Sequence, residues 1–479
     1  MLFNTFQFGL FYIIVLLGFG LLRGTLRKVF LLGASYYFYM CWNWHYIWVV
    51  LFLTLIDFFA GLQIEKSELP ARRKLYLGLS LAANLGLLGL FKYYNFLAIS
   101  ATAGINAFGP HLSAPILNVI LPVGISFHTF QAMSYTIEVY RRKVPAEHNL
   151  LNYSLYVAFF PQMVAGPIER PHQLLPQFHS DPRIGIERVH SGLRIALWGF
   201  FKKMVIADSI SGLVNTVYSD PSKFSNTELV VATVCFAIQI YCDFSGYSDI
   251  AIGLARVMGY ELRLNFRQPY FSRSVGEFWH RWHISLSTWF RDYLYIPLGG
   301  NRVRLPRYLL NLFITFAASG LWHGASWTFI AWGALHGFYL IASKLTVGFR
   351  EKVAKVSGIS RFPRLHAVFQ TLCTAVLVTV AWVFFRAKDI HAAFYVVRHL
   401  IPGGHFRDSA LSGLPRANVP FIVFFIASMF VVEWFMFHPS RVPKLWGSIA
   451  LRYAAYYSVI FAIILFGVFG HIDFIYFQF

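Results

Sequence analysis

The chain has 479 residues, of which 57% are hydrophobic, 19% aromatic and only 13% charged. Soluble domains carry about 25% charged residues, so this composition excludes an ordinary soluble fold and indicates a protein whose solvent is lipid. The formal net charge is +20. Because the Lys and Arg residues cluster between apolar runs, basic loops at an anionic membrane surface explain this charge better than nucleic-acid binding.

Apolar runs of roughly 20 residues, the length at which a helix crosses a bilayer, recur along the chain. The first run has no basic region before it and no A-x-A-like cleavage site, so we expect a retained helix and not a signal peptide. We find no internal repeat. The sequence predicts one all-α polytopic membrane domain over 1–479 with about 11–13 membrane segments, some of them re-entrant. The candidate segments are 2–22, 29–44, 45–64, 75–99, 115–138, 150–165, 190–213, 229–255, 308–322, 325–343, 366–386, 418–437 and 450–470.

The region 256–307 is unusually basic, with nine arginines against three acidic residues. It also carries large apolar side chains at alternating spacings of three and four. This spacing places them on one face of an amphipathic helix, which would lie in the membrane interface or line a polar funnel into the protein. The apolar positions are Trp279, Trp282, Leu286, Trp289 and Tyr293.

Polar side chains follow on a neighbouring face of the same predicted helix. His283, Ser287 and Arg291 are four residues apart, with His280 beside them, and Glu277 is placed to pair with the arginine four residues later, Arg281. His280 and His283 have a spacing that could ligate a metal. No carboxylate or cysteine completes such a site locally, so a proton-transfer or substrate-orienting role is the better interpretation.

The stretch "SGLWHGASW", 319–327, places His323 in a run without charged residues, 308–343. The flanking glycines allow a helix break or the close approach of another backbone or a ligand. Trp322 and Ser326 add an indole and a hydroxyl. One interpretation is a buried histidine bonded to a neighbouring helix. The other is a functional group, because polar residues at membrane depth usually mark a pathway or a site.

Two further stretches carry polar or helix-breaking residues at membrane depth. In "YCDFSGYSDIAIG", Asp243 and Asp249 each cost about 2.5–3.5 kcal/mol to insert, so both need partners. Arginines of the basic region are the natural candidates, and structural ion pairing is preferred over a proton relay. In "FFPQMVAGPIER", 159–170, two prolines and a glycine forbid a regular helix, and such backbone is tolerated only where it is buried or lines a cavity.

Several kinds of site are not indicated by the sequence. The four cysteines lie in apolar segments without a C-x-x-C pair, so we predict neither a disulfide framework nor a zinc site. No histidine is followed by an aspartate five residues later, and no G-x-S-x-G, P-loop or D-x-D motif occurs. If the protein is an enzyme, histidine is its expected base.

Four long motifs resemble membrane-bound O-acyltransferases, in particular the bacterial branch that O-acetylates alginate. They are "FFPQMVAGPIER", "CDFSGYSDIAIGLARVMGY", "NFRQPYFSRSVGEFWHRWHISLSTWFRDYLYIPLGGNR" and "SGLWHGASWTFIAWGALHG". The resemblance extends from "LLGASYYFYMCW" to the closing "HIDFIYFQF" and so covers nearly the whole chain.

The resemblance implies a ring of transmembrane helices around a central tunnel, within the inner membrane of a bacterium. It implies that His323 is the catalytic histidine, in a catalytic segment 308–343, and that His283 is a second important histidine. It implies no bound cofactor. The donor would be acetyl-CoA or another acyl thioester, and the acyl group would pass to an extracytoplasmic partner of the SGNH-hydrolase type, which loads a polysaccharide.

Local chemistry agrees with such a role. An imidazole can deprotonate a hydroxyl or protonate a leaving thiolate near neutral pH, and the arginines could hold the phosphates of the donor. His323 would act either as a base or as a transient carrier of the acyl group. Donor-binding or tunnel-lining positions are expected at Trp322, Ser326, Trp279, His280, Arg281, Ser287, Arg291, Asp243 and Asp249.

Other functions remain open at this point. The same motifs resemble the peptidoglycan O-acetylation branch and, more distantly, the branch that transfers D-alanine to teichoic acid. A proton-coupled transporter with a relay through Asp243, Asp249 and His323 would be of another class, and it predicts inverted repeats. A scaffold that only anchors a periplasmic partner is a further alternative.

Overall fold

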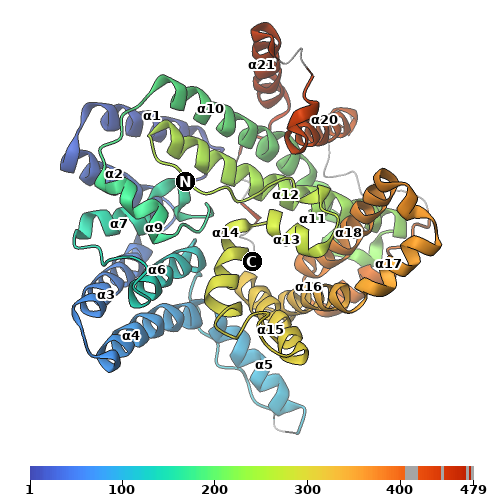
Figure 1. Cartoon of the computed structure of the whole chain (residues 1–479), viewed down its shortest axis with the longest axis horizontal. Helices are drawn as coiled ribbons and strands as arrows, with labels where there is room; N and C mark the ends of the chain where they lie inside the picture. Colours follow the sequence, from blue (N-terminus) through green and yellow to red (C-terminus); the bar gives the residue numbers. More distant parts are fainter. Residues whose placement is uncertain (110, 405–418, 444–446, 471–473, 476–479) are drawn as a thin grey trace. The chain divides into compact units, whose positions relative to one another are not determined.

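Helices form the regular secondary structure throughout the described part of this computed structural model (Figure 1). The structure describes residues 1–109, 111–404, 419–443, 447–470 and 474–475. Contacts divide the chain into two compact units: one holds 1–196 and 247–263, and the other holds 197–246 and 264–475. The boundary falls inside two helices, α10 and α12, and the prediction of a single membrane domain stays a prediction.

Among the described residues, the first unit contains α1 to α9, most of α10 and about the last third of α12. Their bounds are α1 Phe6–Leu21, α2 Gly24–Met40, α3 Ile47–Lys66, α4 Pro70–Leu88, α5 Tyr94–Asn106, α6 Ile125–Tyr140, α7 Leu150–Ala158, α8 Phe160–Met163, α9 Pro171–Leu174, α10 Ile186–Phe200 and α12 Asn226–Val257.

The second unit contains the end of α10, α11, about the first two thirds of α12 and the helices after α12. Their bounds are α11 Asp208–Ser219, α13 Val275–Arg281, α14 Ile284–Phe290, α15 Leu305–His323, α16 Trp327–Leu345, α17 Val347–Val356, α18 Pro363–Arg386, α19 Ile390–Arg398, α20 Val419–Phe437 and α21 Ile449–Phe466. Within the described part of the whole chain, three π-helical segments interrupt or extend the α-helices, at Gly89–Tyr93, Phe201–Ala207 and Arg291–Tyr295.

Six helices among the described residues are long and apolar enough to cross a membrane, which confirms the prediction of an all-α polytopic membrane protein. Each of them coincides with a predicted segment. Residue 418, the first of the predicted segment 418–437, lies outside the described residues, and so does most of "HIDFIYFQF". The total of about 11–13 segments stays a prediction. The six helices are Trp44–Lys66, Pro70–Asn106, Asn226–Val257, Pro363–Arg386, Val419–Phe437 and Ile449–Phe466.

Two predicted segments have a different structure. The segment 115–138 is not helical before Ile125, where α6 begins directly after Gly124 at φ 74°. The segment 150–165 is not one helix but two short buried ones, α7 and α8, which are separated at Phe159 two residues before Pro161. Apolar composition alone does not distinguish such buried short helices from a spanning helix.

The irregular backbone predicted at 159–170 is confirmed, and it is buried as expected. After α8 the chain turns and leads to Glu169, whose side chain is fully buried and accepts a hydrogen bond from the Arg263 N–H at 2.7 Å. Burial raises the pKa of Glu169 to about 7, although the Arg263 N–H and the charges of Arg263 and Arg170 act in the opposite direction. This hydrogen bond fixes the turn after α8 to the backbone of Arg263, and both residues belong to the first unit.

A buried polar cluster joins α3, α4 and α6, which lie together in Figure 1. The carboxylate of Asp57 accepts hydrogen bonds from Ser80 Oγ at 2.5 Å and from Asn84 Nδ2 at 2.9 and 3.0 Å. Ser80 Oγ also lies 3.0 Å from Thr136 Oγ1 on α6. Because each of these side chains would be costly alone in an apolar interior, the cluster fixes the three helices against one another.

In the second unit α15 and α16 pack at backbone distance (Figure 1). A Cβ atom added at Gly320 would lie 2.3 Å from the carbonyl oxygen of Phe329, and one added at Gly333 would lie 2.3 Å from that of Phe316. Glycines are therefore required here for close approach, as small residues are at many membrane helix contacts. This contact fixes the end of α15, where His323 lies.

The close packing predicts that Gly333→Ala destabilises the protein. The added methyl would force α15 and α16 apart, and overpacking of this kind costs about 1–3 kcal/mol. We expect a lower thermal unfolding midpoint in detergent than for the parent. Gly78→Ala on α4, where a Cβ meets no atom within 4 Å, is the matched control. Equal midpoints for the two variants would contradict the glycine contact.

Candidate active site

His323 is the last residue of α15 and is 3% exposed. Its Nδ1 lies 2.7 Å from the carbonyl oxygen of Ser319, one turn earlier. A carbonyl can only accept, so Nδ1 carries a proton, and in the neutral ring Nε2 has the basic lone pair. The backbone of α15 thereby sets the tautomer of the imidazole.

The residues after His323 end one helix and begin the next. Gly324 is extended, at φ −160°, so its φ does not require glycine; a Cβ there would instead lie 2.2 Å from the ring of Phe329. Ser326 caps α16 by accepting a hydrogen bond from the Thr328 N–H at 3.1 Å. The sequence offered two reasons for a glycine beside His323, a helix break and a close approach. At Gly324 the close approach, by the ring of Phe329, is the one that requires glycine.

Aromatic rings surround the His323 imidazole. Ring centroids lie 4.8 Å away for Trp332, 5.0 Å for Trp322 and 5.6 Å for Phe385. All three side chains are buried. Such walls exclude water and offer contact area to a short acyl chain.

His283 lies beside His323, with ring centroids 6.3 Å apart and planes at 81°. It is fully buried, and the ring of Phe244 packs edge-on against it at 4.6 Å. Its backbone is left-handed, at φ 44° and ψ 54°. A left-handed non-glycine residue costs about 1–3 kcal/mol and persists only where its surroundings fix it.

Asn265 supplies that fixation. Its Oδ1 lies 3.2 Å from His283 Nδ1 and accepts hydrogen bonds from Ser285 Oγ at 2.9 Å and the Ser285 N–H at 3.2 Å. Its carbonyl oxygen accepts from the Ile284 N–H at 2.9 Å. An amide oxygen is an acceptor, so His283 is held with the proton on Nδ1, as His323 is.

The prediction of one continuous helix through Trp279 and Tyr293 is wrong. Helix α13 ends at Arg281, Trp282 is extended and α14 starts at Ile284. The N–H groups that would continue the helix bind Asn265 instead, and the Arg281 carbonyl accepts from the Arg267 N–H at 2.9 Å. Four residues of the apolar stripe are nevertheless buried, Trp279, Trp282, Leu286 and Trp289, and Tyr293 is partly buried.

The remaining residues predicted on this helix have other neighbours. Arg281 pairs with Glu277 at 2.9 Å, which confirms the predicted first-turn pair. Arg291 is exposed and pairs with Asp292 at 2.8 Å, and His280 is exposed. Ser287 Oγ donates to the Trp282 carbonyl at 3.1 Å. These contacts do not bring Arg281, Arg291 or Ser287 to His283 and His323.

Trp279 is linked to the surroundings of His323 through His336, a histidine that the sequence reasoning missed. Its Nε1–H donates to His336 Nδ1 at 3.2 Å, and both side chains are buried. The ring of His336 lies 5.1 Å from that of Trp332, which in turn contacts His323. The signal for His336 was its position in "ALHG", thirteen residues after His323 and in the same uncharged run.

The two aspartates of "YCDFSGYSDIAIG" fall in different units. Asp243 pairs with Lys203 at 2.6 Å and accepts a hydrogen bond from the Ile475 N–H at 2.7 Å. The prediction of an arginine partner from the basic region is therefore wrong for Asp243, because a π-helical segment turns Lys203 into the interior. Asp249 lies in the first unit and is partly buried.

Lys203 also pairs with Asp208 at 2.8 Å, so one buried ammonium joins two carboxylates. Phe244, next to Asp243, is the residue that packs on His283. The ion-paired cluster thus fixes the part of α12 that supports the second histidine. Among the described residues, no group of three or more His, Cys, Asp and Glu side chains is arranged to hold a metal ion.

Comparison with known proteins agrees with this architecture. The sequence profile of the membrane-bound O-acyltransferase family matches residues 118–376. A probable alginate O-acetylase of Pseudomonas aeruginosa is 37% identical over 421 residues, which cover 88% of this chain and 78% of that protein.

Two other relatives are named for different activities. A peptidoglycan O-acetyltransferase of Helicobacter pylori is 34% identical over 400 residues, which cover 78% of this chain and 73% of that protein. A teichoic acid D-alanyltransferase of Streptococcus thermophilus is 29% identical over 281 residues, which cover 53% of this chain and 66% of that protein. The chain is a multi-pass membrane acyltransferase that belongs to the membrane-bound O-acyltransferase family.

Proposed function

We propose that this enzyme is an O-acetyltransferase of the bacterial inner membrane in which His323 is the catalytic base. The observation that carries the proposal is the hydrogen bond from His323 Nδ1–H to the Ser319 carbonyl. It leaves Nε2 as the basic atom of a buried ring that aromatic side chains surround. A base in this form needs no prior deprotonation to act near neutral pH.

In the proposed reaction, Nε2 takes the proton of an acceptor hydroxyl while the hydroxyl oxygen attacks the carbonyl carbon of an acetyl thioester. The tetrahedral intermediate then collapses, the carbon–sulfur bond breaks and the oxygen ester forms. The imidazolium returns its proton to the leaving thiolate, so the enzyme ends in its starting form. His283 lies close enough to orient the reacting groups.

The final acceptor of the acetyl group is proposed to be an exported polysaccharide of the alginate type. The acetyl group would reach it through an extracytoplasmic SGNH-hydrolase-type partner. Support comes from the alginate O-acetylase relatives, which cover most of this chain. The peptidoglycan relative keeps that polymer as the alternative. The acetyl content of alginate and of peptidoglycan in cells that lack this chain separates the two acceptors. Membership of an acyltransferase family leaves no support for the transporter.

The donor is proposed to be acetyl-CoA or another acyl thioester on the cytoplasmic side. The arginines of 256–307 are the proposed contacts for its phosphates. Arg281 and Arg291 have carboxylate neighbours. Arg304 and Arg307 are exposed and have no carboxylate within ion-pair distance among the described residues. They are therefore the better candidates within the region.

His323→Ala is expected to lower acetyl transfer from labelled acetyl-CoA by about 10²–10⁴-fold, the usual contribution of a general base. The exposed His190→Ala is the matched control and should transfer like the parent. Both variants should unfold at the parent's temperature. Transfer by His323→Ala within twofold of the parent would disprove the assignment, and a labelled acetyl group trapped on His323 would show that it is a carrier and not only a base.

Asn265→Ala should lower kcat by roughly 10–100-fold with little change in KM, because a displaced His283 would misalign the reacting groups. Asn265→Asp keeps an acceptor oxygen at the same place and should recover part of the rate. Steady-state kinetics on purified protein measure both constants. If the two variants lose kcat equally, or if only KM changes, Asn265 does not act by positioning His283.

Replacing Arg304 and Arg307 together by Gln should raise KM for the thioester by at least about tenfold, since even one charge-assisted hydrogen bond is worth about 1.5–3 kcal/mol and about 1.4 kcal/mol is tenfold in affinity. The matched control replaces Lys352 and Lys355, two exposed lysines outside the basic region. An unchanged KM in the arginine variant, or an equal rise in the control, would remove these arginines from donor binding.

A further inference from the structure

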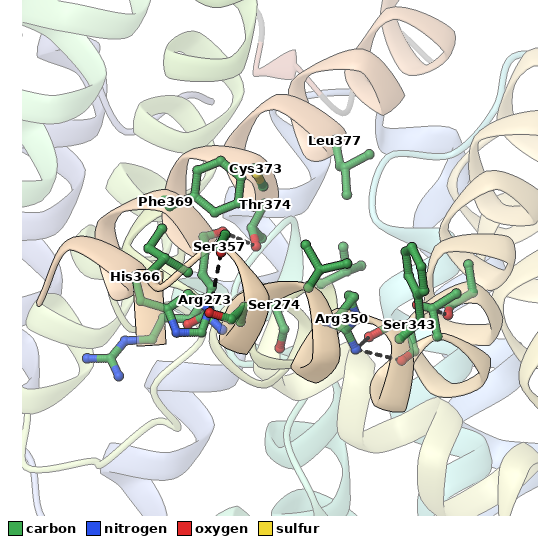
Figure 2. A pocket seen from close by; sticks show the side chains of 18 of the residues that line it. Arg273, Ser274, Ser343, Arg350, Ser357, His366, Phe369, Cys373, Thr374 and Leu377 are labelled. Atoms are coloured by element: carbon green, nitrogen blue, oxygen red, sulfur yellow. Dashed lines mark hydrogen bonds between the residues drawn. The ribbon is translucent and has the colours of Figure 1, made fainter. Parts of the chain in front are cut away.

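A cavity lies in the second unit, apart from the two histidines. It is bounded by α16, α17 and α18 with the start of α13, and Figure 2 shows its lining side chains. Its volume is about 1120 Å³. Neither His323 nor His283 is among the lining residues. We call this cavity the α17 groove.

The groove has an apolar wall of large exposed side chains. Phe338, Phe349, Phe362 and Phe369 are 55–69% exposed, and Leu365 is 58% exposed. One wall is α18, which is long and apolar enough to cross a membrane. In a membrane protein such side chains face lipid, and in this cavity they offer an apolar surface to a ligand.

Cations and hydroxyls interrupt this apolar lining. Three arginines and one histidine line the groove, whereas no Asp or Glu does: Arg273, Arg350, Arg361 and His366. Figure 2 shows Arg350 beside Ser343, and its Nη2 donates to the Ser343 carbonyl oxygen at 2.7 Å and to Oγ at 3.2 Å. Within the described ranges, no carboxylate lies at ion-pair distance from Arg350 or Arg361.

On α17 the residues that line the groove are apolar apart from Arg350. Phe349, Arg350, Val353 and Ala354 line the groove. The other charged residues of the helix are not among the lining residues: Glu351, Lys352 and Lys355. An amphipathic helix with lysines on its polar face is typical of the membrane interface.

The connection from α16 to α18 also carries a strong positive charge. Lys344, Arg350, Lys352, Lys355, Arg361 and Arg364 stand against one acidic residue, Glu351. The positive-inside rule assigns such a short basic connection to the cytoplasmic side, where the leaflet is anionic. The groove therefore combines an apolar wall, unneutralised guanidinium groups and a position at an anionic surface.

We propose that the α17 groove binds an anionic phospholipid of the cytoplasmic leaflet. The headgroup phosphate binds to the arginines at the rim, and the acyl chains lie against the phenylalanines of α16, α17 and α18. A small anionic metabolite fits less well, because the volume exceeds the roughly 300–1,000 Å³ of a usual small-molecule pocket and most of the lining is apolar. A zwitterionic lipid would leave the arginine charge uncompensated.

Native mass spectrometry of the full-length protein in detergent tests the proposal, with phosphatidylglycerol, phosphatidylcholine and glycerol phosphate added in turn. We expect phosphatidylglycerol to bind about tenfold more tightly than phosphatidylcholine, the effect of one charge-assisted hydrogen bond. Replacing Arg350 and Arg361 by Gln should abolish that preference. The matched control replaces Lys352 and Lys355 by Gln, on the same helix but off the groove, and should keep it.

Three results would overturn the proposal. They are equal binding of the two lipids to the parent, an equal loss in the lysine control, and saturation of the same site by glycerol phosphate, which would indicate a soluble anion as the ligand. If the arginine variant does not fold, Ala342→Phe decides, because it fills the groove and keeps every charge. This variant should lose the bound lipid, and retention of the lipid would place it elsewhere.

Discussion

The hydrogen bond between His323 Nδ1 and the Ser319 carbonyl is the interaction on which the proposed chemistry depends. The Ser319 carbonyl and the His323 side chain lie one turn apart on the same face of α15, in the last turn of the helix. The end is fixed by the glycine contact with α16, since Gly320 and Gly333 admit no side chain between the two backbones. Close helix packing, helix termination and imidazole tautomer are thus parts of one arrangement.

The second histidine depends on a different constraint. A continuous helix would have presented His283 on its surface, with the backbone N–H groups satisfied internally. Asn265 takes up these groups instead and holds His283 in a left-handed conformation beside His323. Strain of this kind is commonly stored at functional sites. The buried Lys203–Asp243 pair supports the same place from α12 through Phe244.

Sequence reasoning predicted what periodicity and composition encode. The long apolar helices, the irregular backbone at 159–170 and the Glu277–Arg281 pair each follow from residues that are close in sequence. The helix break at Trp282 does not, because the acceptor that causes it is eighteen residues before His283 and nothing in the 3.6-residue period marks it. The apolar stripe predicted burial correctly and connectivity wrongly.

Partners across long sequence distances were the other gap. An aspartate in an apolar helix needs a cationic partner, and the basic region offered nine arginines as candidates. The partner is instead Lys203, forty residues before Asp243. The π-helical segment Phe201–Ala207 places Lys203 beside Asp243, and no residue pattern predicted this segment. His336 was missed for a related reason: its role rests on Trp279 and Trp332, which belong to separate helices.

The tautomer of His323 is the quantity that tests this account most directly. Solid-state ¹⁵N NMR of histidine-labelled protein in lipid reports the protonation of each ring nitrogen, and a spectrum of His323→Gln identifies the signal that belongs to His323. The account predicts a neutral ring at pH 7 with a proton on Nδ1 and none on Nε2. A proton on Nε2, in either the opposite tautomer or the imidazolium, would contradict it.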